Sequence, residues 1–199
     1  MAPFYNALPF TLTDAQRRCV EEAIADMQSG KPMNRLCQGD VGSGKTMVAA
    51  ACVYFCIKNG RQAALMAPTE LLAEQHYRGL APLLERLNIR CALLTGSTPA
   101  KTKRSVTAQL ATGEIDFAIG THALISGGVA YADLGLVVTD EQHRFGVRQR
   151  GILAGKANNP HLLVMSATPI PRTLGLLMYG DLDISIIDEM PAERLPIKN

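Results

Sequence analysis

The fold is decided by one stretch, Gly39-Asp40-Val41-Gly42-Ser43-Gly44-Lys45-Thr46. It matches G-x-x-x-x-G-K-[ST] at every fixed position, the pattern of a phosphate-binding loop. Its glycines let the backbone turn tightly and approach a phosphate chain without a Cβ in the way. The loop N–H groups and the start of the next helix then face the anion, where the helix dipole also favours negative charge. We predict that Lys45 reaches the β- and γ-phosphates of a nucleotide and that the Thr46 hydroxyl binds Mg²⁺.

The residues around this loop support that interpretation over a chance glycine-rich turn. Residues 35–38 predict a strand before the loop, and residues 46–57, rich in Ala, Val and Met, predict a buried helix after it. Further along, apolar runs predict strands over 62–67, 90–94, 116–119, 134–139, 161–165 and 183–187. Helical patterns cover 13–28, 69–87, 98–112 and 170–179. Gly79 and Pro82 are candidate breaks in the second of them, and Thr98 is expected to cap the third. Continuous apolar strands separated by helices indicate an α/β fold with a mostly parallel central sheet covered on both faces.

Composition limits the other possibilities. With 199 residues, 47% of them hydrophobic, the chain can bury the core of one α/β domain. No apolar run approaches the ~20 residues that span a bilayer, so we expect no membrane partner. The net charge of +2 indicates no partner by itself. Five cysteines without a C-x-x-C pattern favour a reducing, cytoplasmic compartment, and we expect Cys52 and Cys56 to be buried thiols rather than metal ligands.

A second catalytic element follows the predicted strand 134–139. Asp140 and Glu141 stand at its carboxyl end, where open parallel sheets bind their ligands. We predict that Asp140 holds Mg²⁺ from the side opposite to the phosphate loop. Glu141 would orient and polarise the attacking water. A solvated strand end is the competing interpretation, and the phosphate loop upstream favours the catalytic one.

Six short blocks together resemble the first motor lobe of superfamily 2 helicases and translocases. They are Gly39 to Thr46, Ala67-Pro68-Thr69-Glu70, Thr95-Gly96, Gly120-Thr121-His122, Asp140-Glu141-Gln142-His143 and Ser166-Ala167-Thr168. Within that superfamily, the segments 38–46, 66–76 (M-A-P-T-E-L-L-A-E-Q-H), 140–147 (D-E-Q-H-R-F-G-V) and 167–174 (A-T-P-I-P-R-T-L) are similar to the RecG family of branched-DNA helicases. This resemblance extends over about residues 8–197. The transcription-repair coupling factor shares most blocks but usually has Phe or Tyr at the position of Ser43 and Glu at that of Gln142, so it ranks second.

The resemblance implies a RecA-like P-loop NTPase sandwich that uses ATP and Mg²⁺ to remodel branched DNA, such as replication forks and Holliday junctions, in recombination and repair. Lys45, Asp140 and Glu141 would be catalytic, and the whole loop with Gln16 would bind the nucleotide. In related motors a glutamine at this place recognises adenine. Thr13-Asp14-Ala15-Gln16 also fits a capping box, which explains the same residues without a ligand.

The remaining blocks imply a DNA path and a coupling relay. The DNA path would comprise Pro68, Thr69, Thr95, Gly96, Thr121 and His122. The relay between the γ-phosphate and DNA would comprise His143, Ser166 and Thr168. Helix capping is the alternative role for Thr69, and a satisfied buried network with no switching role is the alternative for the relay.

The expected organisation is a short tether followed by one lobe. We interpret residues 1–10 as the tether, with Phe4, Tyr5 and Phe10 as anchors, and leave open a vector origin for the residues before Leu8. Residues 11–199 form the ATP-binding lobe, whose partners in the family are a second RecA-like lobe and a wedge domain in cis. We expect a monomer that binds Mg-ATP weakly and hydrolyses it very slowly alone. A small-molecule kinase is one alternative function, but it would need an arginine-rich lid, and the sequence after Asp140 contains no such segment. A nucleotide-sensing module without turnover is the other alternative.

Overall fold

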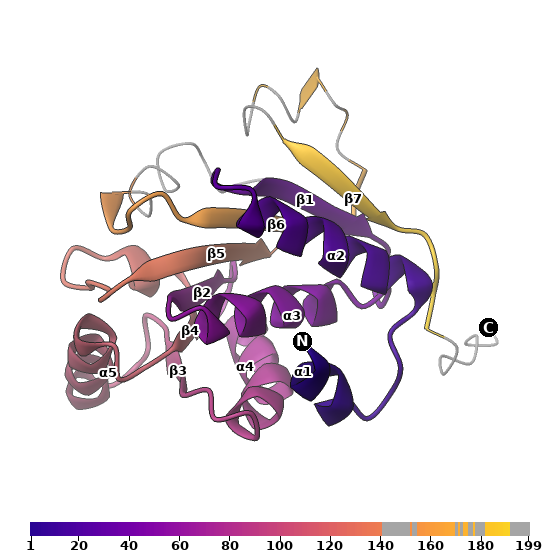
Figure 1. Cartoon of the computed structure of the whole chain (residues 1–199). Coiled ribbons are helices and arrows are strands. Elements are labelled where there is room, and N and C mark those ends of the chain that lie inside the picture. Colours follow the sequence, from indigo (N-terminus) through magenta and orange to yellow (C-terminus); the bar gives the residue numbers. More distant parts are fainter. Residues whose placement is uncertain are drawn as a thin grey trace.

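The centre of the molecule is a single twisted sheet with helices on both faces (Figure 1). This computed structural model describes residues 1–140, 152, 155–169, 171, 173, 174, 177 and 182–191. In that part of the chain the sheet has seven strands in the order β3-β4-β2-β5-β6-β1-β7, and each pairing is parallel. The strands are β1 (Asn34–Gly39), β2 (Gln62–Met66), β3 (Cys91–Leu94), β4 (Phe117–Gly120), β5 (Leu134–Asp140), β6 (His161–Ser166) and β7 (Asp183–Ile187). The predicted parallel α/β sandwich is therefore confirmed.

Helices cover the sheet in two groups. They are α1 (Ala2–Ala7), α2 (Asp14–Gln28), α3 (Lys45–Lys58), α4 (Glu70–Glu85), α5 (Ala100–Thr112) and the short 3₁₀ helix η1 (His122–Ile125). Buried side chains of α2, α3 and α4 share one core cluster with one face of the strands. Buried side chains of α5 and η1 form a second cluster on the opposite face of β2, β3, β4 and β5. Within the described residues, no helix has the length and apolar character needed to cross a membrane.

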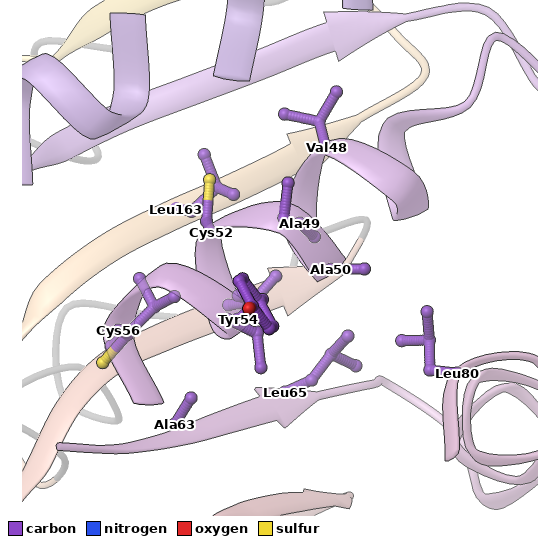
Figure 2. Packing of buried hydrophobic residues seen from close by; sticks show 14 of the residues in the cluster. Val48, Ala49, Ala50, Cys52, Tyr54, Cys56, Ala63, Leu65, Leu80 and Leu163 are labelled. Atoms are coloured by element: carbon purple, nitrogen blue, oxygen red, sulfur yellow. The ribbon is translucent and has the colours of Figure 1, made fainter. Parts of the chain in front are cut away.

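The helix that follows the phosphate loop is buried along most of its length. Its run of small residues, Ala49 to Cys52, is fully excluded from solvent, so the helix lies close to the sheet. In Figure 2 this helix lies beside Leu163 of β6 and Leu65 of β2, which belong to the same core cluster. A helix that is apolar all round belongs inside a domain rather than on its surface. The core therefore fixes α3, and with it the end of the loop that opens this helix.

Three details differ from the sequence-based expectation. Residues 2–7 form α1, and the Phe4 side chain is fully buried, with its ring centroid 5.6 Å from that of Tyr54. Helix α4 runs without interruption through Gly79 and Pro82, both of which we considered as breaks. The expected cap of α5 was wrong: Pro99 occupies the N-cap, because the Thr98 hydroxyl accepts a hydrogen bond from the Thr95 N–H at 2.9 Å instead.

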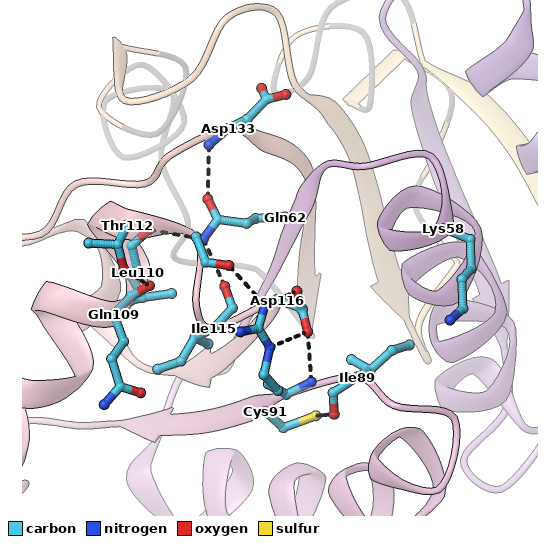
Figure 3. A network of polar contacts seen from close by, with 12 residues as sticks. Lys58, Gln62, Ile89, Cys91, Gln109, Leu110, Thr112, Ile115, Asp116 and Asp133 are labelled. Atoms are coloured by element: carbon cyan, nitrogen blue, oxygen red, sulfur yellow. Dashed lines mark hydrogen bonds and ion pairs between the residues drawn. The ribbon is translucent and has the colours of Figure 1, made fainter.

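Polar contacts hold the amino ends of the strands. Gln62, at the start of β2, donates to the carbonyl oxygens of Leu110 and Ile115 at 2.9 and 2.8 Å and accepts from the Asp133 N–H at 2.9 Å (Figure 3). The Asp116 carboxylate forms an ion pair with Arg90 at 3.0 Å beside it. Because Gln62 is only 6% exposed, these partners satisfy a polar group that would otherwise be costly to bury. This end of the sheet is structural, and the predicted site lies at the opposite end.

Candidate nucleotide site and nucleic-acid edge

The predicted catalytic residues meet at the carboxyl edge of the sheet. The phosphate loop follows β1, Asp140 ends β5, and β6 lies between these two strands. The register pairs Gln38 of β1 with Ser166 and Asp140 with Met165, so the ends of all three strands are level. Parallel pairing therefore gathers residues that are about a hundred positions apart in the sequence, as the ligand site of an open parallel sheet requires.

The loop has the backbone conformation that its glycines permit. Gly42 and Gly44 have φ values of +84° and +90°, a region that side chains disfavour. A Cβ on Gly44 would also lie 1.9 Å from Nε2 of Gln16. Gly44 is the N-cap of α3 and provides no capping side chain. The first-turn N–H groups of α3 are thus without a side-chain cap, an arrangement that suits an anion at this helix end.

The Lys45 ammonium lies against the loop itself. Its Nζ donates to the carbonyl oxygens of Gly39 at 2.6 Å and Asp40 at 3.0 Å. An ammonium has three N–H donors, so these two bonds leave one donor for a phosphate oxygen. The contact of Lys45 with a nucleotide stays a prediction.

Gln16 forms the predicted capping box and also reaches the phosphate loop. Its Oε1 accepts from the Thr13 N–H at 2.9 Å, and the Thr13 hydroxyl accepts from the Gln16 N–H at 3.1 Å. Its Nε2 donates to the carbonyl oxygen of Ser43 at 2.8 Å. The side chain is nearly inaccessible, at 2% exposed for the residue. The capping interpretation is confirmed, and adenine recognition by Gln16 stays a prediction.

Asp140 contacts a residue that the sequence analysis did not select. The distance between its Oδ2 and Nε2 of His76 on α4 is 2.5 Å, and both side chains are 12% exposed. Sequence patterns indicated this contact only weakly. His76 is the last residue of the M-A-P-T-E-L-L-A-E-Q-H segment, and it lies 64 positions from Asp140. Glu141 and His143 lie outside the described residues, so their predicted roles stay predictions.

The donor set suits Mg²⁺. Thr46 offers a hydroxyl and Asp140 a carboxylate, the oxygen ligands that this cation prefers. Among the described residues there is no group of three or more His, Cys, Asp or Glu side chains that forms a metal cage. Mg²⁺ is commonly held by one or two protein ligands together with phosphate oxygens and waters, so the arrangement fits.

Burial raises the pKa of both Cys52 and Cys56 to about 12, in agreement with the expected buried thiols.

The candidate DNA-contacting residues follow three neighbouring strands, β2, β3 and β4, at the same edge. Pro68, Thr69, Gly96 and His122 are exposed, whereas Thr95 and Thr121 are buried. The Thr69 hydroxyl caps α4 by accepting from the Leu72 N–H at 3.2 Å, which confirms the capping role that we considered for it.

Two of the edge loops are joined by a carboxylate. Glu70, in the first turn of α4, accepts from the Ser97 N–H at 2.9 Å and from the Ser97 hydroxyl at 2.8 Å. The Thr95 hydroxyl lies 3.2 Å from that of Ser97 and 3.4 Å from that of Thr98. Hydrogen bonds therefore hold the loop after β3 together and connect it to α4.

Ser166 and Thr168 form a local turn at the end of β6. The Ser166 hydroxyl donates to the Thr168 carbonyl oxygen at 3.0 Å and lies 3.3 Å from the Thr168 hydroxyl. This turn lies between the strand of the phosphate loop and the strand of Asp140. Its position is compatible with a relay between them, and the relay itself stays a prediction.

Comparison with known proteins identifies the protein family. The DEAD/DEAH box helicase model matches residues 13–177. The chain belongs to the DEAD/DEAH box helicase family. It is 57% identical over 191 residues to the ATP-dependent DNA helicase RecG of Streptococcus pneumoniae, covering 96% of this chain and 28% of that protein. It is 54% identical over 195 residues to RecG of Bacillus subtilis, covering 98% of this chain and 29% of that protein.

Solved structures agree with this assignment. A RecG bound to a three-way DNA junction superposes with a TM-score of 0.82 at 48% identity, covering 98% of this chain and 26% of the RecG chain. The DUF1998 helicase MrfA bound to DNA and AMPPNP has a TM-score of 0.66 at 19% identity, covering 92% of this chain and 30% of its own, and shows the shared fold alone. The chain thus spans less than a third of the length of these helicases. The resemblance to the first RecA-like lobe of RecG is confirmed at the level of family and fold.

Proposed function

We propose that this chain is the ATP-binding motor lobe of a RecG-type helicase that remodels branched DNA. The observation that carries the proposal is the shared edge of the sheet. The phosphate loop and Asp140 lie at the ends of β1 and β5, and the candidate DNA residues lie at the ends of the adjoining strands β2, β3 and β4. Identity of 54–57% to RecG proteins over nearly the whole chain supports the same reaction.

The proposed chemistry is phosphoryl transfer from ATP to water. The loop N–H groups and Lys45 hold the β- and γ-phosphates, while Thr46 and Asp140 hold Mg²⁺, which neutralises charge that develops on the phosphates. Glu141 orients and polarises the attacking water. Gln16 holds the loop through Ser43, and its contact with adenine is part of the proposal.

The proposed DNA path uses hydroxyls and backbone groups rather than a strongly basic surface. Exposed Thr69 and His122 offer side chains, whereas buried Thr95 and Thr121 would act through their backbone and through the loops that they hold. When the γ-phosphate is lost, a relay would transmit the resulting change to this path. Its proposed members are Ser166, Thr168 and His143.

The proposed context is a larger motor in the bacterial cytoplasm that works as a monomer. The second RecA-like lobe and a wedge domain would join this lobe in cis. An arginine from a partner lobe is worth ~10³–10⁵ in rate in related NTPases, so this lobe alone should hydrolyse ATP very slowly.

Glu141→Gln tests the proposal against a nucleotide sensor without turnover. The variant should keep binding of Mg-ATP and lose the residual hydrolysis, measured by phosphate release at high protein concentration. Lys45→Ala is the control that should lose both. Hydrolysis that persists unchanged in Glu141→Gln, or wild-type binding with no turnover at all, would contradict a motor lobe.

A further inference from the structure

The contact between His76 and Asp140 has no part in the chemistry proposed so far. It joins two elements that adjoin in the fold, the helix after β2 and the end of the neighbouring strand β5. The two atoms, Nε2 of His76 and Oδ2 of Asp140, are 2.5 Å apart. Both side chains are largely shielded from water, which strengthens a hydrogen bond that involves a charge.

The direction of this hydrogen bond follows from its chemistry. An ionised carboxylate has no proton to give, so the His76 ring donates its Nε2–H and Asp140 accepts. Among the described residues, His76 is the one side chain that hydrogen-bonds Asp140. This bond uses one carboxylate oxygen, Oδ2, so the other oxygen, Oδ1, is the candidate ligand for a cation.

The helix that carries His76 is itself held at several points. Its first turn is capped by Thr69, and Glu70 binds Ser97 of the neighbouring loop. Ala73 and Leu80, on either side of His76 in the helix, are buried in the core cluster. These contacts hold α4 along this length, and with it the part of the helix that carries the imidazole.

We propose that His76 is a positioning residue for Asp140, which fixes one carboxylate oxygen so that the other faces the Mg²⁺ of the bound nucleotide. The inference rests on the proposed function, because Asp140 is a metal ligand only if the lobe binds Mg-ATP. Partners that orient a metal-binding carboxylate typically change metal affinity by about 10–100-fold when they are removed. His76 also connects Asp140 to α4 about two turns from the Thr69 cap, and so to the helix end that borders the candidate DNA path.

The test is a Mg²⁺ titration of this chain with a fluorescent, non-hydrolysable ATP analogue. The midpoint in Mg²⁺ and the affinity for the analogue in EDTA are measured separately. His76→Leu removes the donor, and His76→Gln keeps an N–H near the position of Nε2. Gln75→Leu is the matched control, since it makes the same kind of change at an exposed position of α4 with no described polar partner. Each variant is repeated with Asp140→Asn, and His76→Asn replaces His76→Leu if the latter fails to fold.

We expect His76→Leu to raise the Mg²⁺ midpoint by about tenfold or more while the affinity in EDTA stays unchanged. His76→Gln should restore much of the midpoint, Gln75→Leu should leave it unchanged, and with Asp140→Asn the His76 substitution should add nothing. A midpoint in His76→Leu equal to that of Gln75→Leu, or a shift that persists with Asp140→Asn, overturns the inference while the proposed function stands. A wild-type chain that binds no analogue at any Mg²⁺ concentration overturns both.

Discussion

Replacing Gln16 by Met separates its structural role from its predicted contact with adenine. Met has a similar length but no polar amide, so the variant loses the bonds from the Thr13 N–H and to the Ser43 carbonyl oxygen. Each bond contributes about 1 kcal/mol net, and the loss is larger where a buried partner is left unsatisfied. For the two bonds together, we expect the free energy of unfolding to fall by about 2–4 kcal/mol. In a chain of this size, that corresponds to a fall in melting temperature of roughly 5–15 °C.

The assay is urea unfolding, followed by analogue binding with adenine and guanine nucleotides. Gln28→Met is the matched control, because Gln28 lies on the same helix but is exposed. If Gln16 acts only through the cap and the loop, both nucleotides should lose affinity by the same factor. If it also recognises the base, the preference for adenine should disappear. A stability no lower than that of Gln28→Met would refute the reasoning, because the two hydrogen bonds would then contribute nothing.

Three further predictions concern other contacts of the fold. Phe4→Ala should destabilise the chain by about 3–5 kcal/mol in urea unfolding, because the ring is fully buried, whereas a small loss comparable to that of Tyr5→Ala would show that α1 is dispensable. Burial lowers the pKa of His161 from 6.5, so the stability that its neutral form provides is present above that value and is lost as pH falls through the lowered pKa. His161→Asn, which gains no proton, should flatten this part of the stability–pH curve, and an unchanged curve would exclude the residue as its source. Glu70→Ala should speed amide exchange at Ser97, since the carboxylate that accepts this N–H is gone, while Glu74→Ala should not; equal rates in the two variants would contradict the tie between α4 and the loop.

Local patterns in the sequence were enough to predict most of the sheet and the phosphate loop. The spacing of Thr13 and Gln16 predicts their capping box, because both partners lie within one helical turn. The loop pattern requires a glycine at position 44, and Gly44 has a positive φ value; Gly42, at a variable position of the pattern, has one as well. The apolar run before Asp140 predicts a buried strand, and the strand end then follows.

Features that depend on distant contacts could not be predicted in this way. Phe4 was expected to act as an anchor, but its partner Tyr54 on α3 depends on a distant contact that no pattern within residues 1–10 reveals. The partner of Asp140 depends on β2 and β5 being neighbours, an order that the sequence does not specify. Helix α4 continues past Pro82 because Leu83 and Leu84 beyond it are buried, and tertiary packing outweighs the local preference for a break.

The central claim is that this lobe carries a preformed half of an ATP site. It is tested most directly by calorimetric titration of the chain with Mg²⁺ and a slowly hydrolysed ATP analogue, using Lys45→Ala as the control. The account predicts saturable binding by the wild type that Lys45→Ala abolishes while its unfolding midpoint stays near that of the wild type. No binding by the folded wild type, or equal binding by the variant, would contradict a phosphate site built from this loop.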